Sequence, residues 1–555
     1  MTRELIRVGI IGSGASGLAQ LKQLLDAFAR PEVKRRADLE VVCFEKQEEV
    51  GGVWFANEDA EKRYRTASTD ASSSLPAGEQ AEQVYVYPPA GEDPSPMYEG
   101  LRTNLPHDLM AFRSLPMPPS LPLFPTRAQI QAYLVSYATI FDLYPYIRFR
   151  TTVRRLYQPS DPSAAGGRRW MIEYAGADGD VTEMGLDFVC CANGHYADGW
   201  IAPVPGLSSF KGKVVHSRYF RSAEDYTGQK VLVVGSFASG GDISRLLAAY
   251  NLGMYTKTDN SANNGGTASH NGRSIIAPER QIDVHVSCSA RSAFSVDTDD
   301  PDTPWGKYVT YHPLIDHISS SGEDSIIHFE DETALEGVDT IIFATGYNFA
   351  LPFAKGEDRP WCDSPLFDKR IEEGERELGH AWEKGGLKGL GVKGLDGLML
   401  FMENDRSICF PVMQYQVVPF PLAESQTRLS ALLWAGLLPS FPDNPQPPRN
   451  ASNPYSSSPP STSTAKSSGA FSASDPQPPP EPSATAVKPP RKVMQTRQKL
   501  VFGAPYEWEY QEYLMELMVE ADKDGVGVEE CWKGIEGFRR EKRADTGLRK
   551  RTLGY

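Results

Sequence analysis

The fold is most strongly constrained by residues 5–18, which read L-I-R-V-G-I-I-G-S-G-A-S-G-L. Ile6–Ile11 is a β-rich run, and Leu18–Phe28 after it has the apolar spacing of a helix. A second β-rich run follows at Asp38–Phe44. The order strand, glycine turn, helix, strand predicts a βαβ unit, the building block of nucleotide-binding α/β folds.

The turn in this unit has the pattern Gly-x-Gly-x-x-Gly. The first glycine permits a sharp turn, the second lets the backbone approach a pyrophosphate, and the third lets helix and strand pack closely. A glutamate ends the second strand, where it can accept hydrogen bonds from both ribose hydroxyls. The pattern predicts a dinucleotide site, and the alternative is a purely structural turn. The residues of this predicted site are Gly12, Ser13, Gly14, Ala15, Ser16, Gly17 and Glu45.

The first half of the unit recurs later in the chain. The strand Lys230–Val234 leads into a turn reading G-S-F-A-S-G, which opens a helix. Phe237 stands where the close-approach glycine is expected. The recurrence predicts a second dinucleotide site on Gly235, Ser239 and Gly240, and the alternative is again a structural turn.

Arg291 follows the next β-rich run after this turn. A guanidinium at this edge would bind a 2′-phosphate through two hydrogen bonds and so select NADPH. The alternative is a solvated surface arginine.

Composition excludes several classes of protein. The 555 residues suffice for two to four domains of about 150 residues. A net charge of −15 argues against nucleic-acid binding. No apolar run reaches the about 18 residues of a transmembrane helix, and no signal peptide is expected. The seven cysteines lack metal-ligand or dithiol spacing, so we expect no metal site and a cytoplasmic, reducing setting.

Two nucleotide-binding units in one chain usually carry a flavin and a nicotinamide. Dithiol reductases with this layout need a spaced cysteine pair beside the flavin, but the close pair here, Cys190-Cys191, is adjacent in sequence. We therefore expect molecular oxygen to take the electrons.

The chain resembles the flavin-containing monooxygenases, and within them the fungal-type branch. The run Phe210–Phe220, F-K-G-K-V-V-H-S-R-Y-F, matches the family fingerprint F-x-G-x-x-x-H-x-x-x-[YF]. Glu45–Trp54 is similar to the flavin-site motif E-K-x-x-x-x-G-G-x-W, Leu101–Pro106 to L-x-T-N-x-P, and Phe343–Tyr347 to F-A-T-G-Y.

The resemblance implies roles for individual residues. FAD would lie on the first turn with Glu45, Gly52 and Trp54, and Thr345 and Gly346 would bring backbone N–H groups near it. NADPH would lie on the second turn and Arg291. Asn104 corresponds to the family asparagine beside the flavin and bound NADP, with capping of a turn as the alternative. Tyr219 would reach the NADP ribose or nicotinamide, or would only pack.

The resemblance also implies the reaction. NADPH passes a hydride to the flavin, oxygen adds at flavin C4a to give a hydroperoxide, and a small amine, thiol or sulfide takes up the distal oxygen. One alternative is a Baeyer–Villiger monooxygenase, although the related fingerprint has tryptophan where Phe220 stands. Another is a flavoprotein without oxygenase activity, a diaphorase or scaffold, which Phe237 would favour. The substrate and the oligomeric state, a homo-oligomer included, stay open.

The predicted fold class is α/β, with two Rossmann-like domains and the NADPH domain inserted into a split FAD domain. The FAD domain comprises 1–205 and 335–555, and the NADPH domain 206–334 contains an inserted loop at 251–281. Between Pro442 and Pro490, 14 of 49 residues are proline and 11 are serine. Such a segment buries too little apolar surface to fold, so disorder is predicted there.

Overall fold

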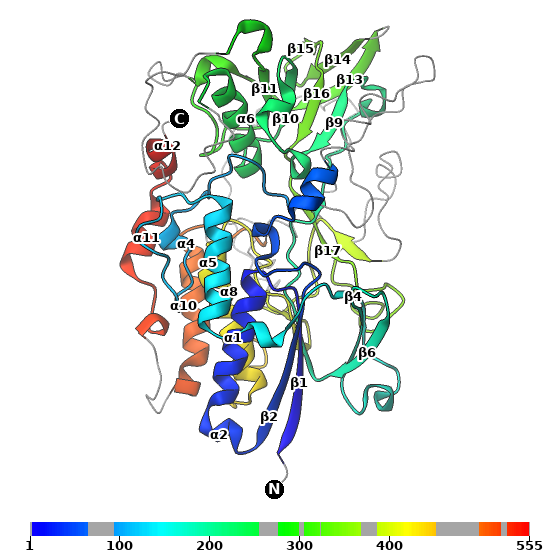
Figure 1. Ribbon diagram of the computed structural model, residues 1–555, viewed down its shortest axis with the longest axis vertical. Coiled ribbons are helices and arrows are strands. Elements are labelled where there is room, and N and C mark those ends of the chain that lie inside the picture. The colour runs from blue at the N-terminus through cyan, green and yellow to red at the C-terminus, as the bar shows by residue number, and fades with distance from the viewer. Residues whose placement is uncertain are drawn as a thin grey trace, which may run out of the picture.

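The computed structural model describes residues 3–64, 94–254, 276–298, 305–321, 324–367, 386–450, 499–522 and 530–553. Two sheet-containing units follow one another along the long axis of the molecule, as Figure 1 shows. Most of the predicted inserted loop 251–281 and of the Pro/Ser-rich segment 442–490 lies outside the described residues.

The first unit is built on a six-stranded sheet, with the strand order β19-β20-β7-β1-β2-β3. All neighbours are parallel except β19 and β20. The strands are β1 (Glu4–Ile11), β2 (Ala37–Phe44), β3 (Ile147–Arg148), β7 (Phe188–Cys191), β19 (Phe401–Met402) and β20 (Asp405–Cys409). Val41 and Cys43 face one apolar core and Val42 and Phe44 face another. Burial of both faces explains why these strands read as continuous apolar runs.

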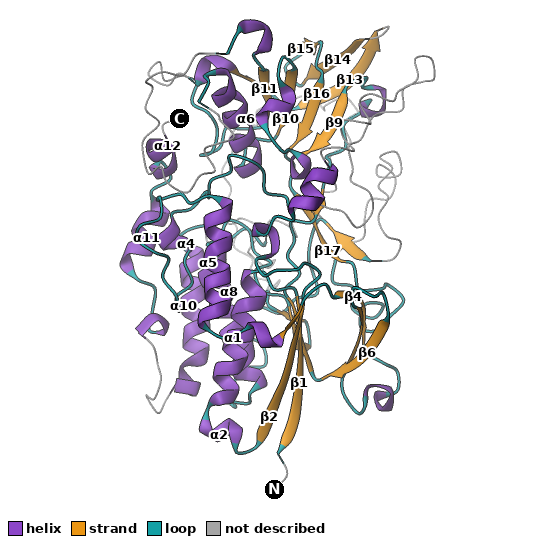
Figure 2. Ribbon diagram, viewed as in Figure 1, coloured by secondary structure: helices purple, strands orange, loops and turns teal. Residues whose placement is uncertain are grey.

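Helices cover one face of this sheet, and a smaller antiparallel sheet covers the other (Figure 2). The helices are α1 (Ala15–Ala29), α5 (Arg127–Ile140), α8 (Pro419–Trp434) and α10 (Tyr506–Met518), and the short α2 (Pro31–Lys34) and α4 (His107–Met110) lie between them in sequence. The smaller sheet comprises β4 (Thr152–Tyr157), β5 (Trp170–Ala175) and β6 (Val181–Leu186). Helix α1 begins at Ala15, within the first glycine turn.

The second unit has a five-stranded, fully parallel sheet with the order β12-β11-β10-β16-β9. Its strands are β9 (Lys213–His216), β10 (Lys230–Val234), β11 (Asp283–Ser287), β12 (Val309–His312) and β16 (Thr340–Phe343). One face packs on α6 (Ala238–Asn251). The other packs on the antiparallel sheet of β13 (Ile315–Ser321), β14 (Asp324–Phe329) and β15 (Ala334–Glu336). The predicted α/β fold with two Rossmann-like units is therefore confirmed.

Two observations bear on the predicted boundaries, which stay predictions. β16 lies beyond the predicted boundary at 334/335, and it pairs with both β10 and β9 in the middle of the second sheet. At the start of the Pro/Ser-rich segment, the Asn450 side chain is buried and donates hydrogen bonds to the carbonyls of Val501 and Phe502. The proline-rich composition does not predict these few contacts.

Three short strands, β8 (Asp198–Gly199), β17 (Tyr347–Leu351) and β18 (Leu387–Gly389), form a small sheet in the connections between the units. His216 lies beside it, with Nε2 bonded to the Gly346 carbonyl at 2.9 Å and Nδ1 accepting from the Arg218 amide. His216 thus joins two connecting segments.

The chain ends in α11 (Gly537–Ala544) and α12 (Leu548–Leu553), which run from the first unit towards the second (Figure 1). Among the described residues, no helix combines the length and apolar character needed to cross a bilayer.

Candidate cofactor sites

In the first turn, the surrounding backbone leaves no room for a side chain at two of the three glycines. Gly12 has a φ of +97°, and a β-carbon there would lie 2.7 Å from the Ala192 carbonyl oxygen. A β-carbon on Gly17 would lie 1.9 Å from the Gly12 carbonyl oxygen. Side chains at these positions would break the packing of α1 on β1.

Gly14 differs, because the packing of the described residues does not require glycine there. Its φ is −70°, and a β-carbon would meet only the backbone of Gly52 among them, with the Cα at 3.6 Å and the nitrogen at 3.9 Å. Gly14 and Gly52 thus face each other as two stretches of bare backbone at the start of α1. Within the described part of the chain no side chain caps this helix, so its first N–H groups can bind an anion. This cradle fits the pyrophosphate of a dinucleotide.

Glu45 lies against this turn and is 4% exposed. Its Oε2 accepts hydrogen bonds from the backbone N–H of Ser13 at 2.7 Å and from the Ser13 hydroxyl at 2.9 Å. Its Oε1 accepts from the backbone N–H of Gln47 at 2.9 Å. Glu45 therefore connects β2 to the glycine turn, and its contact with a ribose stays a prediction.

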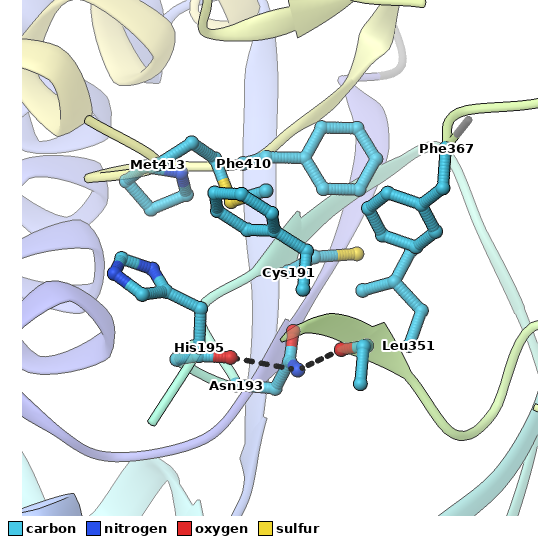
Figure 3. Close-up of a pocket in the computed structure, with 11 residues that line it drawn as sticks. Cys191, Asn193, His195, Leu351, Phe367, Phe410 and Met413 are labelled. Carbon is cyan, nitrogen blue, oxygen red and sulfur yellow. Dashed lines mark hydrogen bonds between the residues drawn. The ribbon is translucent and has the colours of Figure 1, made fainter. Parts of the chain in front are cut away.

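A segment that sequence reasoning did not assign to the first turn also lies there. The Ala192 carbonyl sits under Gly12, and the Asn193 amide donates to the carbonyls of Gly194 and Ala350 at 3.2 and 3.0 Å (Figure 3). The signal was present in the sequence, because Cys-Ala-Asn-Gly after β7 parallels Phe-Ala-Thr-Gly after β16.

The cavity beside Asn193 is small, at about 10 Å³, and is lined mainly by apolar side chains such as Phe367, Phe410 and Met413 (Figure 3). A space of this size admits about one water molecule and no cofactor ring. Cys190 and Cys191 belong to the two cores on opposite faces of the sheet, and burial raises the pKa of both thiols. They cannot act together as a dithiol.

The second turn repeats the construction of the first. Gly235 has a φ of +105°, and a β-carbon there would lie 2.7 Å from the Ala344 carbonyl oxygen. A β-carbon on Gly240 would lie 1.9 Å from the Gly235 carbonyl oxygen. Phe237 is the N-cap residue of α6, and Gly14 is the N-cap residue of α1. Both have extended backbone conformations. The backbone of the turn therefore keeps the course expected for dinucleotide binding.

The Phe237 side chain is 51% exposed and packs edge-to-face on Phe294, with ring centroids 5.1 Å apart. The Ser239 side chain is half-buried in the first turn of α6. The second turn thus differs from the first mainly by an aromatic ring at its outer surface.

Arg291 lies beside the second turn. The two residues that flank it are both tied to Ser236, since the Ser236 hydroxyl donates to the Ala290 carbonyl and the Ser292 hydroxyl donates to the Ser236 carbonyl. The exposed Arg291 guanidinium lies 4.6 Å from the ring centroid of Tyr311. Its position suits a group that binds a phosphate at this edge, which stays a prediction.

Thr345 and Gly346 lie near the second turn, and their expected contact with FAD stays a prediction. They follow β16, and the preceding Ala344 packs under Gly235. The Thr345 hydroxyl donates to the Trp200 carbonyl, and the Gly346 carbonyl accepts from the Trp200 amide at 2.8 Å. The parallel pairing of β16 with β10, not visible in the sequence, causes this placement.

The remaining predicted residues come from loops. Asn104 is exposed just after the buried Thr103. Trp54 ends the short 3-10 helix Gly52–Trp54, and its carbonyl accepts from Arg127 at 3.1 Å. Tyr219 is half-buried and stacks on Tyr64, with centroids 5.7 Å apart. Tyr219 therefore has a packing partner as well as its predicted cofactor role.

Comparisons with known proteins agree with this geometry. The profile of the family described as FMO-like, flavin-binding monooxygenase-like, matches residues 89–260. A flavin-containing monooxygenase of Arabidopsis thaliana, FMO GS-OX5, is 27% identical over 377 residues, 65% of this chain and 66% of its own length. Dimethylaniline monooxygenase [N-oxide-forming] 2 of Macaca mulatta is 26% identical over 379 residues, 62% of each chain. The match to each thus spans just under two thirds of that relative's length.

Among solved structures, S-allyl-L-cysteine S-oxygenase from Allium sativum superposes with a TM-score of 0.59 at 19% identity. The superposition covers 99% of this chain and 94% of that one. At this identity the likeness concerns the fold.

Proposed function

Because this chain belongs to the flavin-containing monooxygenase family, whose members use FAD and NADPH, we propose that it is an NADPH-dependent monooxygenase. It uses O₂ to oxygenate a soft nitrogen or sulfur atom of a small amine, thiol or sulfide. A cytoplasmic location is proposed with it, from the cysteine pattern alone.

One observation carries the proposal. The same glycine turn is built twice, each time between a strand with parallel neighbours and a helix, and in the first turn Gly14 is a glycine that the packing of the described residues does not require. A ligand that presses on bare backbone explains this glycine, and a pyrophosphate is such a ligand.

FAD, when bound, supplies the chemistry of hydride acceptance and oxygen activation. The protein's residues bind and orient. The N–H groups at the start of α1 hold the pyrophosphate, and Glu45 holds the ribose. Arg291 holds the 2′-phosphate of NADPH. The Asn104 amide can donate and accept hydrogen bonds at once, which suits a group between flavin and nicotinamide.

The geometry gives less support to the two rivals. Phe220, where the Baeyer–Villiger fingerprint has tryptophan, is fully buried and stacks on Tyr226 with centroids 5.4 Å apart. Phe237, the residue that favoured a flavoprotein without oxygenase activity, leaves the course of the second turn unchanged. Oxygenation of nitrogen or sulfur stays the better-supported function.

Replacement of Asn104 by alanine tests the proposal. Asn104 is exposed, and its proposed role is to orient the flavin and the nicotinamide. We therefore expect N104A to bind FAD and to allow reduction of the flavin by NADPH. We expect it to release peroxide in place of oxygenated product. Peroxide and product per NADPH would be measured across a panel of amines, thiols and sulfides. The control is N444A, which removes an exposed asparagine whose side-chain oxygen accepts a hydrogen bond from Gln446 at 2.7 Å. An unchanged ratio in N104A would argue against the role of Asn104, and absence of FAD from the wild-type protein would contradict the proposed function.

A further inference from the structure

The C-terminal residues lie along the loop that contains Asn104, which has a role in the proposed function. Residues 530–553 run antiparallel to residues 102–113. Arg539 donates to the Leu109 carbonyl at 2.7 Å, and further along Lys542 pairs with Asp108. The contacts therefore move step by step towards Asn104.

The last of these contacts is made by Arg549, whose side chain is 7% exposed. Its Nε donates to the Thr103 carbonyl at 3.2 Å, and its Nη2 lies 3.5 Å from the Arg102 carbonyl. The same Nη2 donates to Asp242 Oδ1 at 2.8 Å. One guanidinium thus joins the backbone just before Asn104 to helix α6 of the second unit.

Asp242 is the centre of a buried polar cluster. It also accepts from Arg245 at 2.8 Å and from the Tyr98 hydroxyl at 2.9 Å. Burial alone would raise the pKa of its carboxyl, but the two arginines lower that pKa to about 2. Such a buried, fully paired charge holds its partners in fixed positions, because breaking one contact leaves a desolvated charge with fewer partners.

We infer that residues 530–553 form a C-terminal clasp, and that Arg549 is a positioning residue that holds the Asn104 loop in register with helix α6. The inference rests on the proposed function, because it gives the NADPH-binding helix and Asn104 a common anchor. Asn104 and α6 belong to different units, and Asn104 itself is exposed. A displacement of about 1 Å in a reacting group can cost about a hundredfold in rate.

Three variants test the clasp. R549A removes the guanidinium but leaves Asp242 paired with Arg245 and Tyr98, so the fold should survive. R549K keeps a positive charge but cannot present the forked donors. R551A is the matched control, since Arg551 is an exposed arginine of the same helix that pairs with Asp545.

Two measurements are made on the full-length holoenzyme. Hydrogen–deuterium exchange of residues 101–106 should increase at least about threefold in R549A, and less in R549K, with no change in R551A. The ratio of peroxide to oxygenated product should rise between about ten- and a hundredfold in R549A, at unchanged FAD content. R549K should lie between R549A and the wild type.

Equal exchange and equal product ratios in R549A, R549K and R551A would overturn the inference. If R549A does not fold, the test rests on R549K. Exchange at residues 101–106 and a peroxide-to-product ratio equal to those of the wild type in R549K would then overturn the inference. A wild-type protein that oxygenates no compound in the panel would instead defeat the proposed function. Exchange at 101–106 would still test the clasp in that case.

Discussion

At the scale of single residues, alanine substitutions at Gly14 and Gly17 separate an effect on FAD binding from an effect on stability. Ala at 14 has room in the protein, so G14A should fold normally but crowd the pyrophosphate. Overpacking costs about 1–3 kcal/mol, so FAD affinity should fall about 5- to 150-fold. Flavin titration of the apoprotein checks this.

G17A is the control for this pair. Its methyl group would meet the Gly12 carbonyl, so the melting temperature itself should fall. FAD affinity of G14A equal to that of the wild type would contradict the placement of FAD on this turn.

Arg291 is the residue on which coenzyme preference should depend. Hydrogen bonds to charged groups contribute about 1.5–3 kcal/mol, so R291A should weaken NADPH about ten- to a hundredfold and leave NADH within about twofold. The apparent affinities for both coenzymes, from steady-state kinetics, measure this. Arg218 is not a substitute, because it is buried and donates to the carbonyls of Tyr196 and Pro94. Equal losses for the two coenzymes would remove Arg291 from the 2′-phosphate site.

At the scale of elements, two neighbouring strands of the second sheet, β11 and β12, carry a pair of titratable histidines. His312, at the end of β12, lies 2.8 Å from His285 through their ring nitrogens and stacks on Phe329. Burial, and then the charge of His285, lower the pKa of His312 below its usual 6.5, while Asp331 and Asp283 oppose this. The unfolded chain therefore binds a proton more readily than the folded one, and stability is lost as pH falls below 6.5.

We expect the free energy of unfolding to decrease between about pH 7 and pH 5.5, and to decrease less steeply in H312Q. Denaturant melts at several pH values measure this. H317Q is the control, since His317 is a partly exposed histidine of the same unit. A pH dependence that is the same in H312Q and the wild type would exclude His312 as its source.

The Pro/Ser-rich segment divides into two parts. Deletion of 451–488 should leave the melting temperature and FAD content nearly unchanged, because that composition offers little apolar surface to bury. Deletion of 444–488 should lower the melting temperature, because it removes Asn450 and its hydrogen bonds to Val501 and Phe502. Thermal melts of both variants compare them. Equal melting temperatures would mean that Asn450 does not anchor this stretch.

The elements that sequence reasoning recovers are those with local signals. Glycine spacing and apolar periodicity locate β1, α1, β10 and α6, although α6 begins at Ala238, within the predicted turn. Long-range strand pairing is not recovered from the sequence. The insertion of β16 between β10 and β9 places Thr345 and Gly346 beside the second turn, and no local pattern encodes that register.

At the scale of the whole molecule, two dinucleotide-binding units are joined by short connections and by the C-terminal segment. The repeated glycine turn makes the two units predictable from sequence. The contact of Arg549 with Asp242 spans 307 residues and crosses from one unit to the other. Such a contact depends on the folded arrangement and leaves no periodicity or motif in the chain.

The most direct test of the central claim is oxygen-isotope labelling. The purified protein with NADPH and a substrate from the panel would be run under ¹⁸O₂, and the product analysed by mass spectrometry. A monooxygenase places one ¹⁸O atom in each product molecule and consumes one NADPH for it. Consumption of NADPH with peroxide as the only oxygen-derived product, across the whole panel, would contradict the account.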